Sequence, residues 1–290
     1  MTVANALHIA FIGFGEVGQT FAKGLLARDG VRISGYDILL GQPAGERLKA
    51  RATELGVTLH PSPAAAARGA QLVISAVTAT QAEPVAEVAR SYLAAGQTFL
   101  DVNSASPPTK QRAAQHVQAA GAEYVEGAVM AAVLEPGIKV PILAGGPRAA
   151  DTAALLNELG MNLTPVSTEH GVASAMKLCR SIMIKGIEAL MVDCAAASEA
   201  WGVKEPVFAS LAKTFPSIDW HDLAAYMRER VETHGVRRSA EMREAGEMLT
   251  ALGIDPGLAN AVADAQLRGA IKAREQDGLR PSSLPKAAEA

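Results

Sequence analysis

The sequence predicts an α/β first half, with a mostly parallel, doubly wound sheet, followed by an all-helical second half. Three observations support this prediction. Short apolar runs alternate with helical stretches up to about residue 165, which is typical of a parallel sheet covered by helices on both faces. The β signal then disappears, and a long stretch without proline follows at 169–200. A glycine-rich turn at 13–18 joins the first apolar run to the first helical stretch.

The expected elements follow from apolar periodicity, with glycine and proline at the joins. Strands are expected at 7–12, 31–36, 56–59, 71–77, 98–102, 123–129 and 140–144. Helices are expected near 16–28, 43–55, 63–68, 81–94, 107–120, 169–200, 205–214, 218–233, 236–252 and 256–276, and a frayed tail at 278–290. We therefore expect two domains, one at 1–166 and one at 167–290 that begins with the long helix.

The turn at 13–18 has the GxGxxG pattern of dinucleotide-binding proteins, placed between a strand and a helix. Gly13 can form the tight turn, Gly15 leaves the backbone open to a pyrophosphate, and Gly18 lets the helix pack close to the sheet. The phosphates would lie at the helix N-terminus, where free N–H groups and the helix dipole favour anions. We therefore predict a Rossmann domain whose cofactor contacts Gly13, Phe14, Gly15, Glu16, Val17 and Gly18.

Further cofactor contacts are expected at the ends of the predicted strands. Asp37 ends the second apolar run, 19 residues after the last glycine of the turn. Its carboxylate can accept hydrogen bonds from both ribose hydroxyls of an adenosine and would repel a 2′-phosphate, which favours NAD over NADP. Ligands of parallel sheets bind outside the C-terminal strand ends. The residues expected at the cofactor on this basis are Ala76, Val77, Thr78 and Asn103.

Charge and composition narrow the class of protein. The formal net charge is −3 without a basic stripe, so we expect no nucleic-acid partner. No apolar run is long enough to span a bilayer and no signal-peptide pattern is present, so we expect a soluble, cytoplasmic protein. Cys179 and Cys194 lie 15 residues apart in one predicted helix, too far to pair, and are expected to be reduced, buried thiols. No His, Cys and Asp set has metal-ligand spacing, so no metal is expected.

Three stretches beyond the glycine turn have a recognisable pattern. They are Leu100-Asp101-Val102-Asn103-Ser104-Ala105-Ser106-Pro107, Tyr124-Val125-Glu126-Gly127-Ala128-Val129, and Gly171 to Lys177. They are similar to the Asp-x-Ser-Thr-x-x-Pro, Asp-Ala-Pro-Val and Gly-x-Gly-x-x-x-Lys segments of the β-hydroxyacid dehydrogenases, with Ala173 as a departure in the third. The chain thus resembles that family, which includes 3-hydroxyisobutyrate and 6-phosphogluconate dehydrogenases. The resemblance spans nearly the whole chain and points to a subgroup with a distinct C-terminal domain.

The resemblance implies an NAD-dependent oxidoreductase. Hydride would pass between the nicotinamide and a small carbinol or carbonyl substrate, with a β-hydroxy acid or a relative as the expected class. Lys177 would be the catalytic lysine, with Asn103 and Ser104 beside the nicotinamide and the substrate. An ammonium beside the reacting oxygen can supply a proton, and the neutral amine can act as a base. The resemblance also implies a homodimer formed through the helical domain.

Two departures from the family pattern affect positions that are expected to contact the substrate. Met130-Ala131-Ala132 stands where the family usually has Ser-Gly-Gly to hold the substrate carboxylate. Ser181 stands where the family usually has an asparagine, four residues after the lysine. We therefore expect Met130 and Ala131 to contact a more apolar or bulkier substrate, and Ser181 to help position its oxygen.

Lys185 has two interpretations. On a helix, Lys177, Ser181 and Lys185 share one face, so Lys185 could bind an anionic substrate or depress the pKa of Lys177. The alternative, which we favour, is that Lys185 pairs with Glu188 on a solvated surface.

Other roles and functions remain open. Arg237 or Arg238 could hold a substrate carboxylate, although a surface position is favoured for both. The same two-domain frame could reduce a C=N bond with an altered proton donor, but the presence of Lys177 counts against this. A non-catalytic NAD-binding sensor or scaffold is suggested by the replaced Gly-Gly and asparagine positions.

Overall fold

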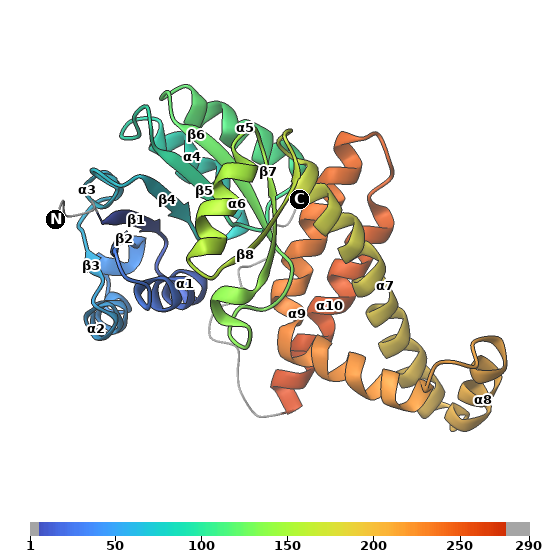
Figure 1. The fold of residues 1–290 in the computed structure, drawn as a ribbon. Helices are drawn as coiled ribbons and strands as arrows, with labels where there is room; N and C mark the ends of the chain where they lie inside the picture. Colours follow the sequence, from blue (N-terminus) through green and yellow to red (C-terminus); the bar gives the residue numbers. More distant parts are fainter. Residues whose placement is uncertain (1–5, 277–290) are drawn as a thin grey trace. The chain divides into compact units, whose positions relative to one another are not determined.

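The structure is a computed structural model that describes residues 6–276 (Figure 1). Contacts between Cα atoms divide the chain into two compact units, Met1–Lys177 and Leu178–Ala290. The described part of the first unit is mostly α/β and that of the second is helical, which confirms the predicted fold class. The boundary expected between residues 166 and 167 stays a prediction, because a division by contacts does not define folding domains. The tail expected at 278–290 lies outside the described residues.

A single sheet forms the centre of the first unit. Its strands are β1 (Leu7–Ile12), β2 (Val31–Tyr36), β3 (Thr58–Leu59), β4 (Leu72–Ser75), β5 (Thr98–Asp101), β6 (Glu123–Val129), β7 (Pro141–Gly145) and β8 (Asn162–Ser167). They lie in the order β3-β2-β1-β4-β5-β6-β7-β8, and every neighbouring pair is parallel except β6 and β7. The strand order reverses between β1 and β4, the position at which doubly wound sheets bind ligands.

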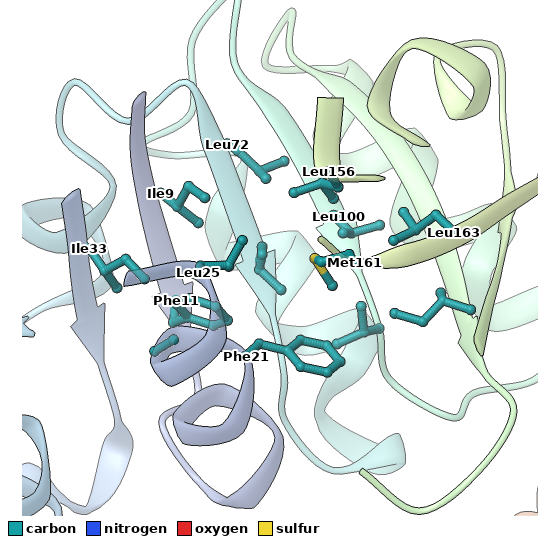
Figure 2. Packing of buried hydrophobic residues seen from close by; sticks show 14 of the residues in the cluster. Ile9, Phe11, Phe21, Leu25, Ile33, Leu72, Leu100, Leu156, Met161 and Leu163 are labelled. Atoms are coloured by element: carbon teal, nitrogen blue, oxygen red, sulfur yellow. The ribbon is translucent and has the colours of Figure 1, made fainter. Parts of the chain in front are cut away.

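Helices cover both faces of this sheet (Figure 1). They are α1 (Glu16–Leu26), α2 (Gly45–Leu55), α3 (Pro63–Ala67), α4 (Ala82–Ala89), α5 (Pro107–Gln118) and α6 (Ala149–Glu158). The unit also contains the short 3₁₀ helices η1 (Ile38–Gly41), η2 (Ala79–Gln81) and η3 (Gly137–Lys139) and the start of α7 (Val172–Ala200). Ile9 and Phe11 of β1 pack in one apolar cluster with Phe21, as Figure 2 shows. Ala10 and Ile12 pack in a second cluster. Since successive residues of β1 belong to different clusters, both faces of the strand are buried, as in parallel sheets.

Two elements of the first unit were not predicted. One is β8, an edge strand in which only Leu163 is buried, so its sequence lacks the apolar run of a central strand. Pro165 is tolerated there because an edge strand leaves some N–H positions outside the ladder. The other is α6, whose alanine-rich sequence follows Pro147 directly. The predicted elements therefore lack one helix and one strand between residues 145 and 167.

The second unit is built from helices. Besides the rest of α7, these are α8 (Lys204–Thr214), α9 (Trp220–Ala251) and α10 (Gly257–Gln276). The two helices expected at 218–233 and 236–252 are one continuous helix, so the predicted break was wrong. A Cβ atom at Gly235 would overlap the carbonyl oxygen of Gln266 and lie 2.9 Å from the Cβ of Ala270. Gly235 therefore permits close packing of α9 against α10, and does not end a helix.

The two cysteines are free, but they are not buried. Cys179 is exposed and Cys194 is partly exposed, so the expectation of buried thiols was wrong. The buried positions of α7 are taken by other apolar side chains, such as Leu178 and Met191. No described helix is both long enough and apolar enough to cross a membrane.

The helical glycines give a test of this packing. We predict that Gly235→Ala lowers the free energy of unfolding by about 1–3 kcal/mol, because the new methyl group overlaps α10. Gly186→Ala is the matched control: its Cβ would meet no described atom within 4 Å, so it should leave stability unchanged or raise it by up to about 1 kcal/mol. Urea unfolding followed by circular dichroism measures both. Equal stability of the two variants would contradict the proposed role of Gly235.

Candidate active site

The glycine turn lies directly against the end of β4. Gly13 has a φ of +91°, and a Cβ atom there would overlap the carbonyl oxygen of Ala76. A Cβ atom at Gly18 would lie 2.6 Å from the carbonyl oxygen of Gly13, so α1 begins against the turn itself. At Gly15, by contrast, a Cβ atom would meet no described atom within 4 Å. This open position at the N-terminus of α1 fits an anionic group such as a pyrophosphate.

Asp37 connects the end of β2 to the glycine turn. Its Oδ2 accepts a hydrogen bond from the Phe14 N–H at 2.8 Å, and its Oδ1 accepts one from the Leu39 N–H at 3.0 Å. Only 9% of the residue is exposed. Each carboxylate oxygen has a second lone pair, so Asp37 can still accept bonds from ribose hydroxyls. The predicted ribose ligand therefore also holds the turn in place.

Asn103 joins the loops that follow β4 and β5. Its Oδ1 accepts a hydrogen bond from the Val77 N–H at 2.6 Å, and its Nδ2 donates to Ser75 Oγ at 3.0 Å. The Val77 side chain in turn lies beside Gly13, where a Cβ atom would come within 2.9 Å of Val77 Cγ1. The structure thus brings together the glycine turn, the loop after β4 and Asn103, which the sequence placed at the cofactor.

Lys177 and Ser104 form a direct contact, although they are 73 residues apart in the sequence. The Lys177 Nζ donates a hydrogen bond to Ser104 Oγ at 2.5 Å. Lys177 is 9% exposed, and Ser104 is half-buried in the loop after β5. Both residues belong to the first unit, as does the glycine turn. The pair places a cationic group and a hydroxyl together at the end of the sheet where ligands are expected.

Glu126 fixes the start of α7 to the sheet, a role that the sequence did not reveal. This carboxylate lies on β6 and is completely buried. Its Oε1 accepts from the N–H groups of Gly171 and Ala173 at 2.8 and 2.9 Å, and its Oε2 accepts from Ser174 Oγ at 2.9 Å. A negative charge is favoured at a helix N-terminus, where backbone N–H groups have no partner within the helix. Glu126 therefore sets the position of the helix turn that carries Lys177.

A second buried carboxylate, Asp101, holds the loop that contains Ser104. It forms an ion pair with Lys110 Nζ at 2.9 Å and accepts hydrogen bonds from the Tyr124 hydroxyl at 2.8 Å and the Asn103 N–H at 2.9 Å. Burial, and then the neighbouring Asp101, raise the pKa of Tyr124 well above its usual range, so the phenol stays protonated as a donor. The sequence patterns include Asp101 and Tyr124 but do not reveal their contact, and Lys110 belongs to none of them, since a helix lysine has no distinctive spacing.

In the second unit, Lys185 is buried and paired. Its Nζ lies 2.7 Å from Glu241 Oε2 and donates to Ser181 Oγ at 3.0 Å. Burial lowers the pKa of Lys185, while Glu241 acts in the opposite direction. The expected pairing of Lys185 with Glu188 on a solvated surface was wrong, because Lys185 is only 5% exposed and its partner comes from α9.

Glu188 binds arginines of α9. It forms ion pairs with Arg230, at 2.9 Å, and with Arg238. Arg238 is 4% exposed, so the expected surface position was wrong for this residue. Arg237 is more exposed and pairs with Glu241 at 2.7 Å. Both arginines therefore already have carboxylate partners within the chain.

The residues that replace the family's Ser-Gly-Gly follow β6. Met130 is half-buried, and its N–H donates to the carbonyl oxygen of Pro141 at 2.9 Å. Ala131 is exposed. Among the described residues, no three His, Cys, Asp or Glu side chains group as metal ligands.

The chain is similar to known protein families and to solved structures. Residues 8–105 match the family model described as NADP oxidoreductase, coenzyme F420-dependent, and residues 198–268 match a domain of unknown function, DUF1932. A solved conserved hypothetical protein from Sinorhizobium meliloti is 41% identical, with 90% of this chain and 88% of that chain covered and a TM-score of 0.78. A second solved protein of unknown function, described as structurally similar to 3-hydroxyacid dehydrogenases, is 31% identical over 93% of this chain and 99% of its own, with a TM-score of 0.74.

The chain belongs to the β-hydroxyacid dehydrogenase family. Within this family it falls in the subgroup whose C-terminal domain matches DUF1932, and the relationship indicates an NAD(P)-dependent oxidoreductase. The fold is shared with a Mycobacterium tuberculosis 3-hydroxyisobutyrate dehydrogenase at 16% identity, covering 90% and 93% of the two chains with a TM-score of 0.73. It is also shared with an imine reductase from Pseudomonas sp. at 16% identity, covering 95% and 96% with a TM-score of 0.58.

The role of Glu126 can be tested by stability measurements on this family member. We predict that Glu126→Ala lowers the free energy of unfolding by about 2–4 kcal/mol, because three buried donors lose their acceptor. Glu126→Gln keeps one acceptor oxygen and should lose only about 1 kcal/mol. Glu123→Ala, on the exposed end of the same strand, is the control and should change stability by less than about 0.5 kcal/mol. Equal losses for Glu126→Ala and Glu123→Ala would disprove the assigned role.

Proposed function

We propose that this protein is an NAD-dependent dehydrogenase or reductase that acts on a small carbinol or carbonyl compound, with a β-hydroxy acid or a relative as the substrate class. The observation that supports this most directly is the hydrogen bond from Lys177 to Ser104. The bond supports a proton-transferring role for Lys177, which belongs to the same unit as a glycine turn that has room for a pyrophosphate. A protein that only bound the cofactor would have no need of this pair.

Lys177 would move the proton of the reaction. When bound, the nicotinamide cofactor supplies or accepts the hydride. In the oxidative direction the carbinol C–H bond breaks with its electron pair, while the O–H proton passes to the neutral amine of Lys177. In the reductive direction the ammonium of Lys177 donates a proton to the carbonyl oxygen and stabilises its developing negative charge. Because Ser104 accepts its hydrogen bond from Lys177, its own hydroxyl hydrogen can be donated to the substrate oxygen.

Three other residues would arrange the site without moving protons. Asn103, which bonds Val77 in the loop after β4 and Ser75 at the end of β4, would hold that loop beside the nicotinamide. Ser181 would orient the substrate oxygen in place of the family's asparagine. Lys185, whose charge is already paired, would hold the Ser181 hydroxyl and would not itself bind a substrate anion. Met130 and Ala131 would line the substrate side, and they favour a more apolar substrate than Ser-Gly-Gly does.

We propose NAD as the cofactor. Asp37 lies at the end of β2, and its carboxylate would repel the 2′-phosphate of NADP while accepting bonds from the ribose hydroxyls of NAD. Its bond to the Phe14 N–H keeps the carboxylate directly beside the glycine turn.

Reduction of a C=N bond is the second candidate, because a solved imine reductase has the same fold. Lys177 counts against it, since an ammonium that donates to Ser104 is well suited to an alcohol or carbonyl oxygen. A substrate panel that contains 3-hydroxy acids and cyclic imines separates these candidates.

We also propose that the protein is a homodimer, and its cytoplasmic location stays a prediction. Large apolar side chains of the second unit are exposed, and a second copy would cover them. They include Met183, Ile187, Leu190, Trp201, Phe215, Leu252 and Leu258.

We predict that Lys177→Ala lowers kcat about 100- to 10,000-fold on the best 3-hydroxy acid of the panel, because it removes the general acid and base. The absorbance of reduced cofactor measures turnover, and NAD binding followed by fluorescence should be unchanged. Lys139→Ala, which removes an exposed lysine of the same unit, should keep full activity. Full turnover by Lys177→Ala would overturn the mechanism.

The proposed cofactor choice has its own test. We predict that Asp37→Asn raises the ratio of kcat/KM with NADP to that with NAD about 10-fold or more, because a charge that repels the 2′-phosphate is removed. Asparagine keeps one acceptor oxygen for the turn, so the fold should persist. Asp29→Asn, the same charge change at an exposed position before β2, is the control. An unchanged ratio for Asp37→Asn would show that this carboxylate does not select NAD.

A further inference from the structure

A basic cleft lies at the β3 edge of the sheet in the first unit. Its volume is about 530 Å³. The side chains in its lining that carry, or can carry, a positive charge are His8, Arg32, His60 and Arg68. No aspartate or glutamate is among the lining residues.

The cleft exists because β3 is short. Its two residues pair only with Ser34 and Gly35 of β2. The preceding residues of β2, 31–33, therefore have no described strand on their outer side, and all three line the cleft. Unpaired edge positions present N–H and C=O groups that can bind a ligand.

Among the described residues, the arginines of the cleft have no acidic partner. In the described part of the chain, neither Arg32 nor Arg68 forms an ion pair. Other arginines of this unit do: Arg51 pairs with Glu54 at 2.6 Å, and Arg148 pairs with Asp151 at 2.9 Å. Two arginines that face one cleft without a carboxylate repel each other, and an anion between them would remove this repulsion.

The lining also contains a buried histidine, His8. His8 is 3% exposed, and its Nε2 is 2.7 Å from Ser34 Oγ, which donates to the Ala66 carbonyl oxygen at 2.7 Å. Because the serine hydrogen is used in this way, His8 Nε2 must be the donor to Ser34. The other ring nitrogen, Nδ1, is buried and has no hydrogen-bond partner in the described part of the chain. Burial lowers the pKa of His8 and the nearby Arg32 adds to this effect, whereas the backbone of Gly69 opposes it.

We propose that this cleft binds the phosphate group of a small molecule. Arg32 and Arg68 would bind the phosphate oxygens through their planar guanidinium groups, and His60 would provide a further donor. The apolar side chains of Leu26 and Val31 would contact the organic part of the ligand, because the cleft is larger than a phosphate ion.

This site is separate from the cofactor turn. His8 and Arg32 lie near the N-terminal ends of β1 and β2, whereas the glycine turn follows the C-terminal end of β1. Gly13 lies five residue positions after His8 along the strand, which is about 16 Å at roughly 3.3 Å per position. An anion in the cleft and the pyrophosphate of a cofactor can therefore be bound at the same time.

Calorimetry and thermal unfolding test the proposal, with inorganic phosphate and pyrophosphate as probes and sodium chloride at equal ionic strength as the reference. The protein is saturated with NAD, so that the glycine turn is occupied. We expect one binding event per chain, and a rise in Tm of about 2–4 °C with 10 mM pyrophosphate. The variant Arg32→Ala/Arg68→Ala should lose both responses while keeping its circular dichroism spectrum and its dehydrogenase activity.

The control variant is Arg51→Ala/Arg148→Ala, which changes the net charge equally within the same unit but leaves the cleft intact. It should bind the probes as the wild type does. Equal responses of the two double variants, or no response of the wild type, would overturn the proposal. So would a response that appears only when NAD is left out, which would assign the anion to the glycine turn. None of these outcomes depends on whether a 3-hydroxy acid is the substrate.

Discussion

The arrangement of the candidate active site depends on one buried carboxylate at a helix N-terminus. Glu126 lies on a central strand and accepts three hydrogen bonds from the first residues of α7. Burying a carboxylate without hydrogen-bond donors costs free energy, and so does leaving N–H groups unsatisfied at the start of a buried helix. The hydrogen bonds between Glu126 and the start of α7 remove both costs. Gly145 on the adjacent strand makes room for the carboxylate, since a Cβ atom there would overlap Glu126 Oε1. Because Lys177 begins the second turn of this helix, the same bonds determine where its ammonium lies.

Other buried polar side chains hold the neighbouring loops in place along the same end of the sheet. Asp101 holds the loop after β5 through Lys110 and Tyr124, and Asn103 holds the loop after β4. Asp37 does the same for the glycine turn. Each loop that is proposed to contact cofactor or substrate is thus tied to a neighbouring strand by a side chain with satisfied hydrogen bonds. Such a site needs little rearrangement when its ligands bind, which is a condition for effective electrostatic catalysis.

The sequence predicted those parts of the structure that depend on local patterns. Most strands were predicted because a parallel sheet requires continuous apolar runs. The glycine turn was predicted from its GxGxxG pattern, and Lys177 and Ser104 were chosen as candidates through a family pattern. Edge strand β8 and the Glu126 contacts were missed, since they depend on neighbours that are distant in the sequence. Gly235 was taken as a break for the same reason: the sequence shows a glycine but not the α10 backbone that lies against it. Lys185 was assigned to the surface because its partner Glu241 is 56 residues away, as their numbering shows.

The two bonds of Asp37 link cofactor recognition to the geometry of the turn. A residue that served only to select NAD could be exchanged freely when a lineage or an engineer changes the coenzyme. Here, replacing Asp37 would also leave the N–H groups of Phe14 and Leu39 without their carboxylate acceptor. A substitution at Asp37 that removes both carboxylate oxygens therefore takes two hydrogen-bond acceptors from the turn and from η1, in addition to the proposed ribose ligand. A second substitution that supplies a new acceptor would restore the geometry of the turn independently of which coenzyme is bound.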